Sequence, residues 1–264
     1  MTLFFRELKA NRKALIIWSI CMILGVLSGM SKYTTYSSGG TASEALKQLP
    51  HAMRALFGMS SFNVSVMSGF FAFLFSYIVL AAAIHAALLG SGILAKEERD
   101  KTTEFLMVKP ISRTTILTAK LFAAMVNLVI LNLVTLLSSY YFVDLYNKGE
   151  AIHGEITALF VTMLIVQLLF LSLGAFLSAL LKNPKASGSL VTAILFGAYF
   201  IGKITELAGH LNALKVLSPF QYFSYPAIVR GESLNFVSVL LTLLLAIVLA
   251  AGCYYFYRKR DLTV

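Results

Sequence analysis

The sequence predicts an all-α membrane protein with six transmembrane helices, an interfacial N-terminal helix and short re-entrant helices between spans five and six. Its 264 residues are 58% hydrophobic and only 13% charged, with a mean hydropathy of +0.81. Six apolar runs approach or exceed the about 20 helical residues that cross a hydrocarbon core of about 30 Å. A β-barrel is excluded because residues 156–181 stay apolar on every face, without the alternation that barrel strands require.

The six runs fix the positions of the expected helices along the chain. The predicted spans are residues 14–31, 66–95, 117–143, 156–181, 186–203 and 233–257. No internal repeat and no low-complexity tract divides them. We therefore expect a single transmembrane domain covering residues 1–264.

Before the first span, a short amphipathic segment is expected to lie along the inner membrane interface. Leu3, Phe4, Phe5 and Leu8 can share one side of a helix, with basic residues reaching away from it. The apolar run that follows ends without a small-x-small cleavage site, which favours an uncleaved first span over a signal peptide.

The basic residues are distributed asymmetrically and predict the orientation. Fifteen of the 22 Lys and Arg residues fall on one side of the predicted topology. They are Arg6, Lys9, Arg12, Lys13, Lys96, Arg99, Lys101, Lys109, Arg113, Lys120, Lys182, Lys185, Arg258, Lys259 and Arg260. Because Lys and Arg in short loops are retained in the cytoplasm, both termini are expected to be cytoplasmic. The net charge of +10 then indicates contact with anionic lipids and no nucleic-acid partner.

Motifs of self-sufficient chemistry are missing from the sequence. It has no P-loop, no His-Glu-x-x-His and no Gly-x-Ser-x-Gly, so we expect no enzyme, no metal site and no cofactor bound by this chain. The predicted spans carry no Asp, Glu, Lys or Arg away from their ends, which disfavours a gradient-driven carrier.

A few polar residues interrupt the apolar spans. Asn127, Asn132 and Gln167 are expected to form hydrogen bonds between helices. His85 allows two interpretations: a residue that relays protons or contacts substrate, or a neutral side chain packed at a helix interface.

Two helix-surface patterns suggest packing. The small-residue pairs Gly25/Gly29, Ala86/Gly90 and Gly174/Ser178 let helix backbones approach, more often within one subunit than across a dimer seam. Phe70, Phe73 and Tyr77 recur on one face of span two. This aromatic face could be a wall for an amphipathic substrate or could serve packing or lipid exposure.

Segments outside the spans also show a pattern. Between spans two and three, a charged stretch precedes the apolar cluster 105–108, which Pro110 closes. This segment could form a short helix that fits a groove on a soluble protein, or an interfacial turn. After residue 203, apolar sequence is broken by Gly209, Pro219, Pro226 and Gly231, and we expect short helices that re-enter the outer leaflet.

Three motifs of the sequence occur in a fixed order. The first runs from Glu98 to Leu106 and continues with 109–113 and Lys120-Leu121; the others are 217–223 and 256–262. In register, they resemble motifs of the ABC-2 type permeases, the membrane subunits of ATP-binding-cassette exporters. The resemblance covers the whole chain in length, topology and motif order. One departure is Thr102-Thr103, where similar permeases often have Gly-Thr.

The resemblance implies a permease that couples to a separate ATPase subunit holding ATP and Mg, and pairs with a second permease subunit as a homo- or heterodimer. It assigns ATPase coupling to Glu97, Glu98, Arg99, Thr103, Glu104, Phe105, Leu106, Pro110, Ser112 and Arg113. Candidate substrate-path residues are Phe70, Phe73, Tyr77 and His85. We expect export across a bacterial cell membrane. A non-transporting scaffold or sensor subunit of a larger complex is the main alternative, and an importer or gradient-driven carrier is the next.

Overall fold

The computed structural model describes residues 2–37, 53, 62–99, 112–147, 149, 151–181, 184–208 and 212–259. Six helices in this part of the chain are long and apolar enough to cross a membrane. They are α1 (Thr2–Met30), α5 (Met67–Arg99), α7 (Arg113–Tyr146), α8 (His153–Leu180), α9 (Pro184–Ala208) and α11 (Phe236–Lys259). The predicted all-helical fold with six spans is therefore confirmed.

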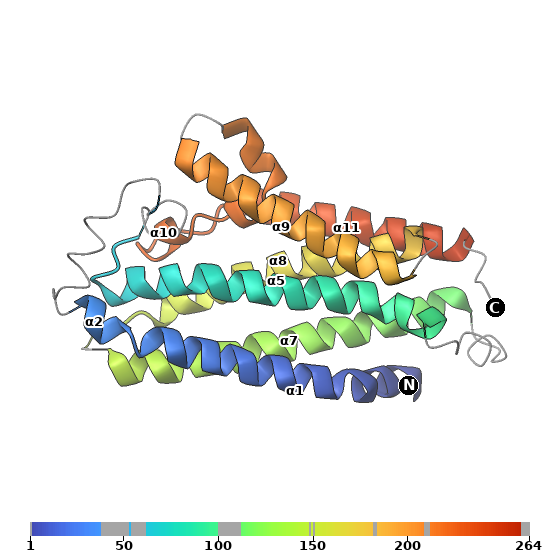
Figure 1. Ribbon diagram of the computed structural model, residues 1–264, viewed down its shortest axis with the longest axis horizontal. Helices are drawn as coiled ribbons and strands as arrows, with labels where there is room; N and C mark the ends of the chain where they lie inside the picture. Colours follow the sequence, from blue (N-terminus) through green and yellow to red (C-terminus); the bar gives the residue numbers. More distant parts are fainter. Residues whose placement is uncertain are drawn as a thin grey trace.

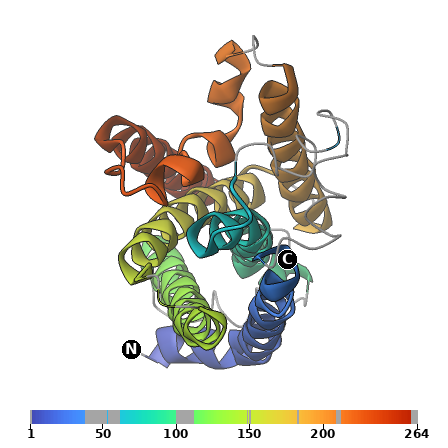
Figure 2. The same cartoon turned by 90° about the vertical axis from the view of Figure 1, so that its left-hand side faces the viewer.

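The long helices form a bundle parallel to the longest axis of the molecule (Figure 1). The main packing partners are α5 and α8; α1 packs on α7, and α11 packs on α8. Helix α9 contacts α5 and α8 but leans away from the bundle at one end (Figures 1 and 2). The core between these helices is rich in aromatic side chains, including the fully buried Phe71, Phe75, Phe160 and Phe170.

The N-terminal segment is continuous with the first span, as one helix from Thr2 to Met30. Figure 2 shows that the first part of α1 runs across the bundle axis, whereas the rest follows that axis. The ring of Phe4 lies 5.4 Å from that of Phe122 on α7. This transverse direction suits the interfacial position that we predict for the segment.

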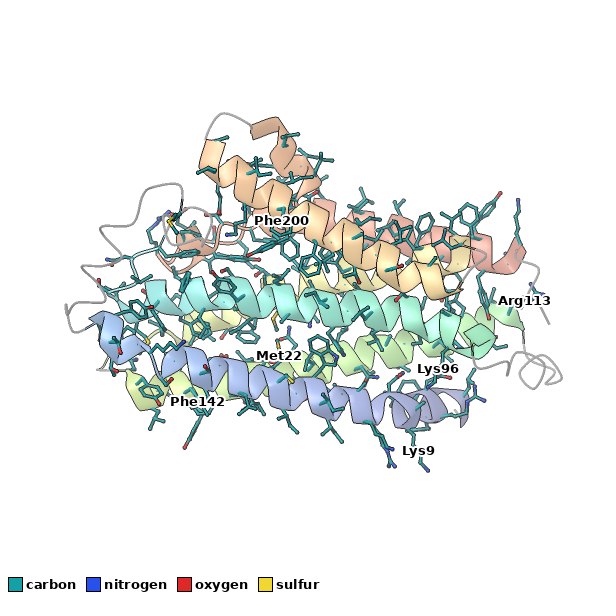
Figure 3. The ribbon with its side chains drawn as sticks, viewed as in Figure 1. Lys9, Met22, Lys96, Arg113, Phe142 and Phe200 are labelled. Atoms are coloured by element: carbon teal, nitrogen blue, oxygen red, sulfur yellow. The ribbon has the colours of Figure 1, made fainter. Side chains whose placement is uncertain are left out.

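The basic residues gather at one end of the bundle, as their predicted topology requires. Figure 3 places Lys9, Lys96 and Arg113 together at the end where α1 begins, α5 ends and α7 begins. Phe142 lies toward the opposite end. We call these the basic end and the opposite end of the bundle.

Helix α9 is longer than the sequence predicted, and this changes the distribution of charge. It continues from Pro184 to Ala208, past the expected end at residue 203. Lys203 and Glu206 therefore lie inside a helix that is long enough to span, and Lys203 is only 8% exposed. Both residues lie within the last two turns of α9, so the charges still fall at the end of the span, and the two side chains form an ion pair.

Small residues bring α5 and α8 into backbone contact. A Cβ atom on Gly90 would clash with the carbonyl oxygen of Leu171, and one on Gly174 would clash with the carbonyl oxygen of Ala87. The pairs Ala86/Gly90 and Gly174/Ser178 thus pack helices within one subunit, as expected. In the third pair, only Gly29 meets another helix, at Leu74 of α5, and a Cβ on Gly25 would meet nothing.

The polar residues of the spans divide into two kinds. The side-chain amide of Asn132 on α7 donates to the side-chain oxygen of Gln167 on α8 at 3.2 Å, and to the carbonyl oxygen of Phe160 at 3.3 Å. These bonds confirm the predicted interhelical role for both residues. Asn127 instead donates to the carbonyl oxygen of Ala123 in its own helix. The prediction for Asn127 was wrong because its side chain folds back on the preceding turn.

The chain between α9 and α11 forms short helices. They are η1 (Asn212–Leu217), η2 (Pro219–Gln221) and α10 (Tyr225–Ile228), and a further short helix, α2 (Tyr33–Ser37), follows α1. Ring contacts hold the segment on the bundle: Phe75 of α5 meets Tyr225, and Phe170 of α8 stacks on Phe220. The predicted short helices are present, and re-entry into the outer leaflet stays a prediction.

Candidate functional site

The predicted ATPase-coupling segment joins the basic ends of α5 and α7. Glu97, Glu98 and Arg99 form the last turn of α5, and Arg113 is the first residue of α7. Ser112 caps α7, since its Oγ accepts a hydrogen bond from the backbone N–H of Thr115 at 3.2 Å. The remaining assigned residues, Thr103, Glu104, Phe105, Leu106 and Pro110, lie outside the described residues.

A buried lysine links these two helices beside the predicted coupling segment. Lys120 of α7 is 1% exposed, and its Nζ donates to the carbonyl oxygen of Ile93 on α5 at 2.8 Å. From sequence we expected Lys120 to be one of the cytoplasmic cations that set topology. The Lys120 side chain also forms a structural contact between α5 and α7, the helices that flank the predicted coupling segment.

Three candidate substrate-path residues of α5, Phe70, Phe73 and Tyr77, form one row of ring contacts, and they differ in exposure. Phe70 is buried against Tyr33 and Tyr36, with ring centroids 5.4 and 5.6 Å apart. Phe73 contacts Tyr77 edge to face at 5.4 Å, and Tyr77 is 39% exposed. The aromatic row thus begins at Phe70, which is buried within the subunit, and ends at Tyr77, whose side chain is partly exposed.

His85 lies at the contact between α5 and α1. Its ring is 4% exposed and meets Trp18 of α1 edge to face at 5.2 Å. Its Nδ1 is buried and has no hydrogen-bond partner among the described residues. A packed histidine at the α1–α5 contact accounts for this geometry.

A polar cavity toward the opposite end of the bundle was not anticipated from the sequence. It has a volume of about 360 Å³ and lies between α5, α9 and the short helices that follow α9. Its charged lining residues are Lys203 and Glu206 of α9 and Lys215 of η1. The sequence signal that could have revealed it is Lys203-x-x-Glu206, an i,i+3 pair of opposite charges at the end of an apolar run.

Hydrogen bonds connect this cavity to the short helices. Lys203 Nζ donates to Glu206 Oε2 at 3.1 Å, and the side-chain amide of Gln221 donates to Glu206 Oε1 at 3.2 Å. The same amide lies 3.4 Å from the carbonyl oxygen of Gly202. Glu206 is the acceptor shared by Lys203 of α9 and Gln221 of η2. These hydrogen bonds join η2 to α9 at the wall of the cavity.

Burial affects two tyrosine hydroxyl groups in the segment between α9 and α11. Burial raises the pKa of both the Tyr222 and the Tyr225 hydroxyl above its usual value. Tyr222 donates to the carbonyl oxygen of Val216 at 2.5 Å.

The described residues hold no group of three His, Cys, Asp or Glu side chains placed to bind a metal ion.

Comparison with known proteins identifies the family. The sequence profile of the ABC-2 family transporter proteins matches residues 1–262, nearly the whole chain. The chain belongs to the ABC-2 transporter family. Its members are membrane components of transporters that are not ATPases themselves and associate with an ABC ATPase subunit. No curated protein matches the chain.

Family membership and the six apolar helices together establish the coarse function. The protein is an integral membrane permease of the ABC-2 transporter family.

Proposed function

We propose that this chain is the permease subunit of an ABC exporter, and that it works with a second permease subunit and two ATPase subunits. The observation that supports it most strongly is the family match over residues 1–262. Basic residues cluster at the end of the bundle where α5 ends and α7 begins, which supports an ATPase contact at that end (Figure 3). ATP and Mg belong to that partner, and both termini of this chain are cytoplasmic.

Coupling is assigned to the segment between α5 and α7. Phe105 and Leu106 insert into a groove on the ATPase, since paired apolar side chains on a short helix suit such a site. Glu97, Glu98, Arg99, Thr103 and Glu104 precede them, and Pro110, Ser112 and Arg113 follow, forming a polar rim. The helices on either side are tied by Lys120, which supports a direct route from this segment into α5 and α7.

The substrate path is assigned to the side of α5 that carries Tyr77. Its exposure and its contact with Phe73 support a place along a path shared with a second permease. Phe70 and His85 are then supporting residues behind that surface, since both are buried within this subunit. The direction is export, as in the exporters that the chain resembles.

Substitution in the coupling segment tests the proposal. Phe105→Asp or Leu106→Asp in the reconstituted complex should abolish permease-dependent stimulation of the ATPase, because a carboxylate does not enter an apolar groove. Insertion of the permease into the membrane should be unchanged. Phe105→Leu, which keeps an apolar side chain at the same position, is the control and should retain most of the stimulation.

Two results would contradict the proposal. Full ATPase stimulation by the Phe105 and Leu106 variants would refute the coupling segment. Stable association with an ATPase but no ATP-dependent solute movement in vesicles would favour the scaffold or sensor role.

A further inference from the structure

The cavity beside α9 has the construction of a ligand site. Its volume of about 360 Å³ falls within the range of about 300–1,000 Å³ that small-molecule sites occupy. Its walls come from α5, α9 and the short helices that follow α9, which pack closely against one another. A Cβ atom on Gly202 of α9 would lie 2.5 Å from Ser218 Oγ, so the helix and the short segment are in close contact.

Hydrogen-bond donors exceed acceptors among the charged groups of this cavity. Both carboxylate oxygens of Glu206 are engaged, one by Lys203 and the other by Gln221. The Lys203 ammonium has three N–H groups, and its hydrogen bond to Glu206 uses one of them. Lys215 is exposed and forms no ion pair with a described residue. Two lysines and one carboxylate leave the cavity with a net positive charge.

A buried hydroxyl adds an unused donor. Tyr225 lines the cavity and is 6% exposed, and its hydroxyl has no hydrogen-bond partner among the described residues. Buried hydroxyl groups normally have partners, so a lone one in a cavity wall indicates a group that a ligand satisfies. Because burial raises the pKa of this tyrosine, its hydroxyl stays protonated and able to donate.

Aromatic and apolar residues form another part of the lining, beside the polar Ser76, Thr205 and Ser224. Tyr199 of α9 meets Phe220 of η2 edge to face, with centroids 5.6 Å apart, and Val79 and Phe223 complete this side. A ligand that fits such a cavity has a compact apolar part and one acceptor-rich, negatively charged group.

We propose that this cavity binds an amphipathic anion whose phosphate or carboxylate group is held by Lys203, Lys215 and the Tyr225 hydroxyl. Its apolar part lies against Tyr199, Phe220 and Phe223. This inference goes beyond the proposed coupling to an ATPase and does not depend on it, since binding is a property of the chain alone. The anionic group comes either from an outer-leaflet phospholipid or from a solute.

Direct binding to the full chain tests the site. The purified protein in nanodiscs of phosphatidylcholine is titrated with octyl phosphate by calorimetry, with empty nanodiscs as the background and octyl glucoside as the uncharged probe. Octyl phosphate should bind about tenfold more tightly than octyl glucoside, as expected when charge-assisted hydrogen bonds form in a partly buried site.

Three variants localise the binding. Lys215→Gln and Tyr225→Phe should each weaken octyl phosphate binding by about three- to tenfold. Lys215 is exposed, and Tyr225→Phe keeps the ring that packs on Phe75, so both variants should fold. Lys32→Gln removes an exposed lysine outside the cavity and should bind like the wild type.

A second measurement identifies the source of the anion. Native mass spectrometry of protein released from nanodiscs of mixed phosphatidylcholine and phosphatidylglycerol shows which lipids stay bound. Retention of phosphatidylglycerol by the wild type and its loss in Tyr225→Phe identifies a lipid headgroup as the ligand. Octyl phosphate binding without lipid retention identifies a solute. The proposal is overturned if octyl phosphate binds no better than octyl glucoside, or if Lys215→Gln and Tyr225→Phe bind as tightly as Lys32→Gln.

Discussion

Gly90 of α5 and Gly174 of α8 face each other where the two helices cross. A Cβ atom on Gly174 would lie 3.2 Å from the carbonyl carbon of Gly90, and one on Gly90 would lie 3.1 Å from the amide nitrogen of Ala175. Small residues allow this approach, and in a bilayer such close packing is a principal source of helix association. The contact fixes the position of the two helices that carry the core.

Side chains added at this crossing should separate the helices. We expect Gly90→Ala and Gly174→Ala each to destabilise the protein by about 1–3 kcal/mol, because the neighbouring atoms are backbone and have little room to shift. Denaturation in mixed micelles measures the change. Gly92→Ala is the matched control, since a Cβ there meets nothing within 4 Å. Equal losses at Gly90 and Gly92 would contradict the close packing.

The bond between Asn132 and Gln167 should contribute a measurable coupling energy. A double-mutant cycle with Asn132→Leu and Gln167→Leu should give about 0.6 kcal/mol, the average for hydrogen bonds between membrane helices. The unfolding free energies of the two single variants and the double variant supply the number. Asn127→Leu combined with Gln167→Leu is the control, and its effects should add without coupling because Asn127 bonds within its own helix.

Lys120 should matter for both stability and coupling. Lys120→Met removes the hydrogen bond to Ile93 and should cost about 1.5–3 kcal/mol, the range for bonds to charged groups. We also expect weaker permease-dependent ATPase stimulation, because α5 and α7 would no longer be tied beside the coupling segment. Lys9→Met removes an exposed lysine at the same end and should have little effect on either measurement. A Lys120→Met variant of unchanged stability would show that the contact is dispensable.

His85 should tolerate an apolar replacement. It is buried against Trp18, so His85→Leu should keep the transport rate within about twofold and leave its pH dependence unchanged. Transport across a pH series measures both properties. A lost pH dependence would instead support a proton-relay or substrate-contact role for the histidine.

Labelling of single-cysteine variants can test the orientation of the protein in the membrane. In a background with Cys21 and Cys253 replaced by alanine, Lys32→Cys should react with a membrane-impermeant maleimide in intact cells. Arg258→Cys should react only after permeabilisation, because the basic end is expected to face the cytoplasm. The reverse pattern of labelling would invert the proposed topology.

Much of the fold was predictable because the bilayer imposes a length on each apolar run. The sequence identified six spans, whereas their ends were less predictable, since helices continue beyond the hydrocarbon core. Helix α9 shows the consequence: its extension to Ala208 places Lys203 and Glu206 within the helix. Hydropathy alone does not reveal that Gln221, from a separate helix, completes their pairing.

Side-chain direction was the other limit on prediction. Asn127 and Asn132 lie on the same helix and read alike in sequence, yet only Asn132 faces a polar partner on α8. The Lys120 contact depends on the distance between α5 and α7, which no local pattern encodes. The coupling residues were assigned from their motif, and all of them stay predictions; those within 103–110 also lie outside the described residues.

The glycine crossing also has a mechanical consequence. Because the backbones of α5 and α8 are in close contact at this crossing, we expect the two helices to resist sliding and to tilt together. Phe75 and Phe170, on these two helices, hold Tyr225 and Phe220 beyond α9. We therefore expect a displacement of the end of α5 to move α8 and the short helices at the opposite end of the bundle together.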